Sequence, residues 1–132
     1  RTIDVLDKAD ISHLGTYKTA EDQEKILIKY VKGVKIAFIN YTYGTNGIPV
    51  PYDKKYCVNL IDKDLMLKQI NQAKSENVDM IVACMHWGTE YKTSANSINS
   101  IKSTLSNLSI IFSNSKYCSS LVLSKIAFPI LP

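Results

Sequence analysis

The sequence has little that would support a disulfide framework, a zinc ribbon or a membrane span. Its three cysteines are odd in number and scattered without C-x-x-C spacing, which argues against the first two. No run approaches the roughly 20 apolar residues of a membrane helix, and the nearest, residues 121–131, is short and interrupted by Lys125. No signal peptide is visible and the chain opens on Arg1, so we expect a piece cut from a longer protein.

Acidic residues are absent from residue 92 onward. Residues 1–91 hold 12 basic and 12 acidic side chains, whereas residues 92–132 hold four lysines and no acid, so this tail carries the net charge of +4. Four lysines scattered among serines do not form the clustered basic stripe, interleaved with arginine or aromatic residues, that nucleic-acid binding requires. We therefore expect no nucleic-acid partner.

The rest of the composition is typical of a soluble globular protein, with 45% hydrophobic and 21% charged residues. A chain of 132 residues is long enough for one domain with its own core.

Two β-branched and aromatic runs, 25–31 and 34–43, are joined by Lys32-Gly33 and predict a hairpin. The second run is long and strongly apolar at its start, so we place it centrally in the sheet.

The stretch from Asp79 to Tyr91 organises the prediction of function. Residues 79–85 form a short, nearly continuous apolar run, which predicts a strand buried on both faces. A helix capped by Asp62 precedes it, and strand, helix, strand in this order predicts a parallel pair with a right-handed crossover. The loops at 41–47 and 86–91 then emerge at the same edge of the sheet, where open α/β sheets place their ligands. We predict the functional site at this edge.

His86 is the central candidate residue. It follows the buried strand directly, and Gly88 lets the backbone turn where that strand ends. A second interpretation remains open, in which His86 and Trp87 only plug the end of a core. The other histidine of the sequence, His13, is interpreted as a surface or packing residue rather than a ligand.

Several segments together resemble the bacterial capsule-synthesis protein family called CapA, which is linked to poly-γ-glutamate. They are DVLDKADISHLGTY at 4–17, GVKIAFINYTYGTNG at 33–47, VNLID at 58–62 and MHWGTEY at 85–91. The resemblance covers about residues 2–95 and leaves 96–132 as a divergent tail, so the chain is interpreted as a fragment of one CapA-type domain. It implies an α/β fold, an α+β sandwich of the calcineurin-like metallophosphoesterase type, here incomplete, with a βαβ unit and flanking helices.

The resemblance also implies a metal-dependent site. His86 would bind Mn, Fe or Zn and take part in catalysis, and Glu90 would orient a ligand or accept a proton. The residues that would hold substrate oxygens are Thr45, Asn46, Trp87 and Tyr91. Glu90 is equally well interpreted as a solvated loop carboxylate and Asn46 as a turn residue.

Other metal motifs of the family are missing from this sequence. Two of them would precede Arg1, and a Gly-x-His-Pro-His motif should fall near residues 113–118, where no histidine occurs. One histidine and one glutamate fall short of the usual three protein ligands. We therefore expect that this chain does not assemble a two-metal centre by itself.

The tail keeps one helical spacing but loses the family pattern. The apolar residues that follow a 3-4-3-4 spacing are Ile98, Ile101, Leu105, Leu108 and Phe112. They predict a helix from about Asn96 to Leu108. The loss of every acidic residue, together with the missing motif, suggests the hypothesis that the reading frame is altered or truncated after Tyr91.

Two classes of function follow from the resemblance. The first is a metal-dependent, phosphoesterase-like hydrolase of capsule biosynthesis that acts on an acidic capsule polymer or a phosphoester. The second is an accessory binding domain that grips the polymer or another capsule-synthesis subunit without turnover, or an inactive truncated product. By resemblance the protein is expected in the cell envelope, extracytoplasmic and membrane-anchored, with no transmembrane segment in this chain.

Overall fold

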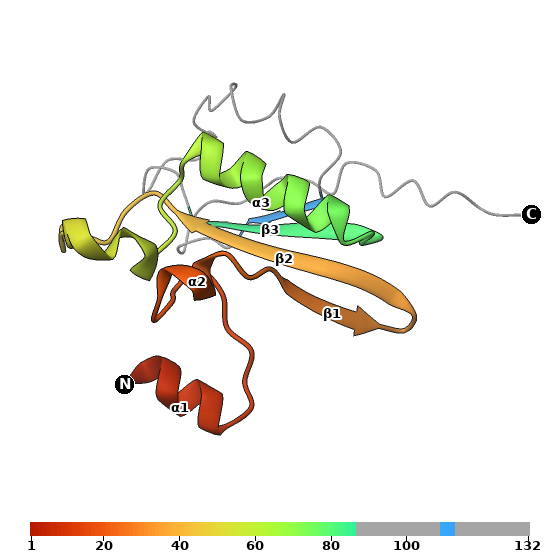
Figure 1. The fold of residues 1–132 in the computed structure, drawn as a ribbon, viewed down its shortest axis with the longest axis horizontal. Coiled ribbons are helices and arrows are strands. Elements are labelled where there is room, and N and C mark those ends of the chain that lie inside the picture. Colours follow the sequence, from red (N-terminus) through yellow and green to blue (C-terminus); the bar gives the residue numbers. More distant parts are fainter. Residues whose placement is uncertain (87–108, 113–132) are drawn as a thin grey trace, which may run out of the picture.

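The computed structural model describes residues 1–86 and the backbone of residues 109–112. This part of the chain has mixed α and β structure, which confirms the predicted α/β class (Figure 1). The elements in chain order are the helices α1 (Thr2–Lys8) and α2 (Ala20–Gln23), the strands β1 (Leu27–Val31) and β2 (Val34–Thr42), the 3-10 helix η1 (Tyr52–Cys57), the helix α3 (Lys63–Ser75), and the strands β3 (Met80–His86) and β4 (Ser109–Phe112).

The predicted hairpin is confirmed by the antiparallel pairing of β1 with β2. Lys32 and Gly33 link the strands with φ angles of 50° and 86°. A two-residue hairpin turn with positive φ at both positions matches the right-handed twist of the flanking strands, and glycine adopts such angles at low cost. The turn chemistry therefore sets the register of this pair.

The predicted strand–helix–strand unit is also confirmed. β2 and β3 pair in parallel, from Ile36 opposite Met80 to Thr42 opposite His86, and α3 lies between them in the chain. The Asp62 side chain caps α3 by accepting a hydrogen bond of 2.8 Å from the backbone N–H of Leu65. A capped helix next to two apolar strands is the arrangement that a parallel pair requires.

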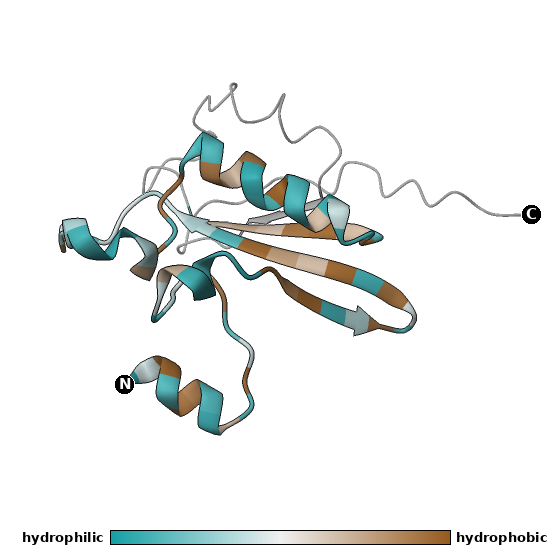
Figure 2. Ribbon diagram, viewed as in Figure 1, coloured by the Kyte–Doolittle hydropathy of each residue, from teal (hydrophilic) through white to brown (hydrophobic). Residues whose placement is uncertain are grey.

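One face of the sheet and one face of α3 form the hydrophobic core. Alternate residues of β2 and β3 point to this face, and Figure 2 shows the hydrophobic stretches of both strands beside the helix. The buried members of the core are Ala37, Ile39, Tyr41, Met66, Ile70, Ala73, Ile81, Ala83 and Met85. Val82 points to the opposite face and is also buried, at 5% exposure, so the sheet is apolar on both sides.

Within the described residues the sheet has the order β1-β2-β3-β4, which places β2 centrally, as predicted. β4 pairs in parallel with β3 and was not predicted. Phe112, which continues the helical spacing in the sequence, belongs to this strand and not to the predicted helix. The predicted helix at Asn96–Leu108 lies outside the described residues.

The segment that contains VNLID runs beside the end of β2. The backbone N–H of Thr42 donates to the Asn59 carbonyl, and the N–H of Ile61 donates to the Thr42 carbonyl, each at 2.9 Å. On its other side, the Asn59 N–H donates to the Gly15 carbonyl at 3.0 Å. This connection ties the carboxyl end of β2 to the segment that precedes α2.

Candidate functional site

The carboxyl ends of β2 and β3 meet at one edge of the sheet, as predicted. Thr42, the last residue of β2, lies opposite His86, the last residue of β3. The next backbone N–H, that of Tyr43, donates a hydrogen bond of 2.8 Å to the His86 carbonyl. The loop after β2 and the chain after β3 therefore leave the sheet at the same place.

The imidazole of His86 contacts the neighbouring strand. Its Nδ1 atom lies 3.0 Å from Oγ1 of Thr42. The Tyr43 ring lies tilted against it, with 5.2 Å between the ring centroids. His86 is half-buried, so it is neither a fully enclosed core residue nor a freely rotating surface side chain.

The loop after β2 holds Thr45 and Asn46 in a tight turn. Asn46 has a φ of 51°, and Gly47 follows with a φ of 78°. The Thr45 hydroxyl donates to the Ile48 carbonyl across this turn. No hydrogen bond joins Asn46 or Thr45 to His86 in the part of the chain that the structure describes, so the turn accounts for both residues while their proposed contact with substrate stays a prediction.

The remaining predicted site residues lie outside the described residues. They are Trp87, Glu90 and Tyr91. Their proposed roles stay predictions.

Sequence reasoning missed Thr42 and Tyr43 as partners of His86. Both belong to the YTYG segment that was assigned to the site loop, but their contacts with His86 depend on the register of β2 against β3.

Cys84, two residues before His86, is half-buried, and burial raises the pKa of its thiol. A thiol of raised pKa is a poor nucleophile at neutral pH, so Cys84 is no candidate for catalysis.

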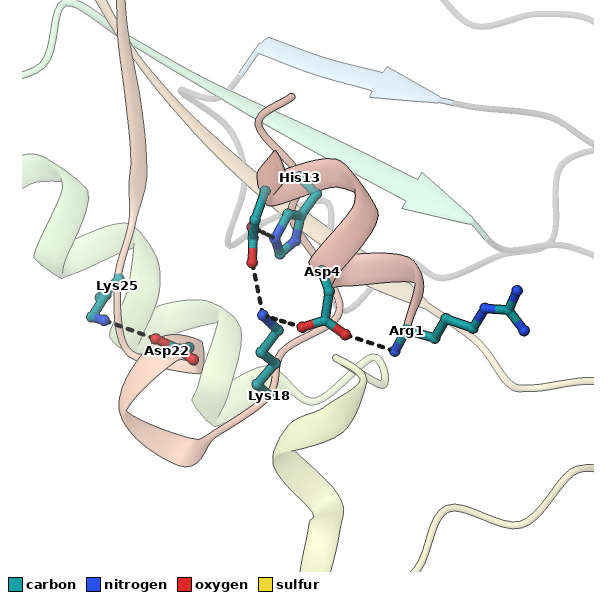
Figure 3. Close-up of polar contacts among 7 residues, drawn as sticks. Arg1, Asp4, His13, Lys18, Asp22 and Lys25 are labelled. Atoms are coloured by element: carbon teal, nitrogen blue, oxygen red, sulfur yellow. Dashed lines mark hydrogen bonds and ion pairs between the residues drawn. The ribbon is translucent and has the colours of Figure 1, made fainter. Parts of the chain in front are cut away.

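A second group of polar side chains lies at α1 and is drawn in Figure 3. The Lys18 ammonium contacts the carboxylates of Asp4 and Asp7 at 2.7 and 2.8 Å. The hydrogen bond and charge of Lys18, together with those of the terminal amino group, lower the pKa of Asp4 to about 2. His13 lies 3.3 Å from Asp7. These ion pairs attach α1 to the segment before α2, and exposed pairs of this kind contribute little to stability.

A comparison with family models matches residues 1–104 to the family described as bacterial capsule synthesis protein PGA_cap. The chain belongs to this family. The match covers more than half of the chain and includes α1, the sheet edge with His86, and the residues that follow Tyr91 as far as 104.

One curated relative of this chain is the capsule biosynthesis protein CapA of Bacillus anthracis. It is 29% identical over 93 residues, which make up 68% of this chain and 23% of that protein. The chain therefore spans about a quarter of the length of this relative and is a partial capsule-synthesis domain. No solved structure matches the chain.

Two properties that the resemblance implies can be compared with the described residues of this family member. Among residues 1–86 and 109–112, no group of three or more His, Cys, Asp or Glu side chains is placed to hold a metal ion. Because a catalytic metal site uses about three protein ligands, these residues do not by themselves fit a divalent metal. In the same part of the chain, no helix has both the length and the apolar character of a membrane span.

Proposed function

We propose that this chain is the part of a capsule-biosynthesis protein that presents His86 to an anionic substrate, either a polymer such as poly-γ-glutamate or a phosphoester. The observation that supports this is the convergence of Thr42, Tyr43 and His86 at the carboxyl edge of two parallel strands. Such edges are where α/β sheets bind ligands. Membership of the capsule synthesis family supports a role in capsule biosynthesis, and the anionic substrate is part of the proposal.

The chemistry that we propose for His86 is proton transfer or ligation through its Nε2 atom. A neutral imidazole at physiological pH accepts a proton or binds a transition metal through one ring nitrogen. Glu90 would act as the second acid–base group, and Thr45, Asn46, Trp87 and Tyr91 would hold substrate oxygens. We propose that a divalent metal, Mn, Fe or Zn, would bind at this site with His86 as one ligand. The other ligands would come from outside residues 1–86 and 109–112.

We also propose that the complete domain is a two-sheet sandwich of the metallophosphoesterase type. The face of the sheet that α3 does not cover supports this, because Val82 is buried there and the neighbouring Phe38 and Cys84 are half-buried. A sheet that is apolar on both faces requires cover on both. In the family setting the protein would work in the cell envelope, anchored to the membrane, beside other capsule-synthesis subunits.

A second candidate function is binding of the polymer without turnover. The observation that favours it is the lack, within residues 1–86 and 109–112, of a metal-binding group of three side chains. In this case His86 and the Tyr43 ring would contribute to a recognition surface. The two candidates differ in whether the polymer or phosphoester is cleaved.

The test uses the complete chain and two matched variants, His86→Gln and His13→Gln, which replace the two histidines of the sequence one at a time. Hydrolysis of bis-p-nitrophenyl phosphate and shortening of poly-γ-glutamate are measured with Mn, Fe or Zn added, and polymer binding is measured by calorimetry. Urea unfolding shows whether each variant folds.

Hydrolysis that is lost in His86→Gln, retained in His13→Gln and unaccompanied by unfolding would support the hydrolase. Polymer binding without cleavage, weakened only by His86→Gln, would support the binding domain. If the unmodified chain neither cleaves nor binds either substrate, or if His86→Gln behaves like the unmodified chain, the proposal is wrong.

A further inference from the structure

The hydroxyl of Thr42 makes three contacts, and their chemistry determines where its proton lies. Its Oγ1 atom lies 2.9 Å from the Gly44 carbonyl oxygen, 3.4 Å from the Gly44 N–H nitrogen and 3.0 Å from Nδ1 of His86. A hydroxyl has one proton to donate and two lone pairs to accept with. The carbonyl oxygen only accepts, so the single Thr42 proton is directed to Gly44.

Nδ1 of His86 must then be the donor in its contact with Thr42. If the Thr42 hydroxyl donated to Nδ1 instead, its oxygen would face the Gly44 carbonyl oxygen at 2.9 Å with no proton between them. That arrangement places two acceptors in repulsive contact. Of the two neutral tautomers, the hydrogen-bond pattern therefore selects the one with its proton on Nδ1 and its lone pair on Nε2.

We infer that Thr42 is a positioning residue that holds neutral His86 in the Nδ1–H tautomer, so that the lone pair of the ring lies on Nε2. This inference rests on the proposed function, because an Nε2 lone pair is what a general base or a ligand at His86 requires. A partner that fixes the tautomer of a working histidine is commonly a carboxylate or a backbone carbonyl. Here a threonine hydroxyl from the neighbouring strand takes that place.

Thr42 is itself held by a rigid support. Its backbone N–H and carbonyl are both bound by the segment at 59–61. Asn59 in that segment is 1% exposed, and its side-chain amide is bound on both sides. The Oδ1 atom accepts from Gln23 Nε2 at 2.8 Å, while Nδ2 donates to the Tyr17 hydroxyl and the Asn40 carbonyl, each at 3.2 Å.

This support gives the Thr42 hydroxyl little freedom to adapt to His86. A buried amide with all its partners in place stays fixed, because breaking any one contact leaves a desolvated polar group. The position of Oγ1 is therefore set by the scaffold, and the imidazole adopts the protonation that fits it.

The test is a nitrogen NMR measurement of the histidine rings in the complete chain, labelled with ¹⁵N-histidine and free of substrate and metal. It is made near pH 8.5, where an ordinary imidazole is neutral. His13→Gln assigns the two signals. The variants are Thr42→Val, which removes the hydroxyl and keeps the shape, and Thr42→Ser, which keeps the hydroxyl.

We expect His86 to be the Nδ1–H tautomer in the unmodified chain and in Thr42→Ser. In Thr42→Val its preference should fall by about fivefold, the ratio that one hydrogen bond of about 1 kcal/mol supports. An Nε2–H tautomer in the unmodified chain, or an unchanged Nδ1–H preference in Thr42→Val, would overturn the inference.

If Thr42→Val fails to fold, Thr42→Ala replaces it as the variant without a hydroxyl. Its Nδ1–H preference is then compared with that of Thr42→Ser, and the same difference is expected. Because the readout uses neither substrate nor metal, its result is separate from the fate of the proposed function. A confirmed tautomer in a chain without activity would leave the positioning role intact and the proposed function wrong.

Discussion

Replacement of Gly15 by alanine should destabilise the fold through two separate effects. Gly15 has a φ of 86°, which costs a residue with a side chain about 1 kcal/mol or more. An added Cβ would also lie 2.3 Å from Oδ1, 2.8 Å from Cγ and 3.1 Å from Cβ of Asn40. Rotation of the Asn40 side chain about its Cα–Cβ bond would relieve the first two contacts, but the third involves Cβ, which is fixed to the backbone of β2.

The crowding of Asn40 sets the size of the second effect. Overpacking of an ordered site costs about 1–3 kcal/mol. The two effects together predict that Gly15→Ala lowers the free energy of unfolding by about 2–4 kcal/mol. That is a large part of the roughly 5–15 kcal/mol that stabilises a typical domain.

Gly33→Ala is a matched control because Gly33 has the same φ of 86°. Nothing lies within 4 Å of the position that its Cβ would occupy. It should therefore show the conformational effect alone, about 1 kcal/mol. The difference between the two variants measures the contact with Asn40.

The assay is urea unfolding of the complete chain, followed by far-ultraviolet circular dichroism, with the unfolding free energy taken from the linear extrapolation. We expect Gly15→Ala to be less stable than Gly33→Ala by about 1–3 kcal/mol. Equal losses in the two variants would show that Gly15 does not pack against β2 as described.

Three further predictions concern other contacts. Tyr41→Phe should cost about 1–3 kcal/mol in unfolding free energy, because the buried Tyr41 hydroxyl donates to Gln69 and its removal leaves a desolvated amide oxygen; an unchanged urea midpoint would contradict this. Asp62→Ala should cost about 1 kcal/mol by removing the cap of α3, and Asp62→Asn should retain most of the stability if capping is the cause. The pKa of Asp4 is lowered to about 2, chiefly by Lys18, so this pair stabilises the fold above about pH 4 and loses that effect as the pH falls toward 2. Lys18→Gln should therefore raise the pKa of Asp4 in a carboxyl NMR titration. An unchanged titration would refute the pairing.

The strands and the helix cap that were predicted correctly are each specified by residues close to them in the sequence. Lys32-Gly33 supplies the positive φ angles of the hairpin, Asp62 caps α3, and the apolar run before His86 forms β3. In each case the determining chemistry lies within a few residues of the sequence. Local signals of this kind are the ones that a single sequence carries best.

β4 lacked such a signal. Ser109–Phe112 is a short strand next to a serine-rich stretch, and four residues are too few to separate a strand period from a helix period. Its pairing with β3 in the structure is a long-range contact. Such a contact depends on the tertiary fold, which outweighs local propensity for short strands.

The contact between Thr42 and His86 could not be predicted from the sequence, because it depends on the register of two strands. Alternation of buried residues determines which face each residue of β2 and β3 occupies, but it does not distinguish registers that differ by two residues. A shift of two would have placed Asn40 or Gly44 opposite His86, with no hydroxyl in contact with the ring.

Asp79 favours the observed register from the opposite end of the strands. Its backbone N–H donates to the Lys35 carbonyl at 2.8 Å, and its carboxylate accepts from the Lys35 N–H at 2.7 Å. From that pair the strands continue without a bulge, from Ile36 opposite Met80 to Thr42 opposite His86. A carboxylate that binds backbone at the start of the strands thus favours the register in which Thr42 meets His86 at their end. The contacts of Asp79 therefore support the proposed site from the other end of the sheet.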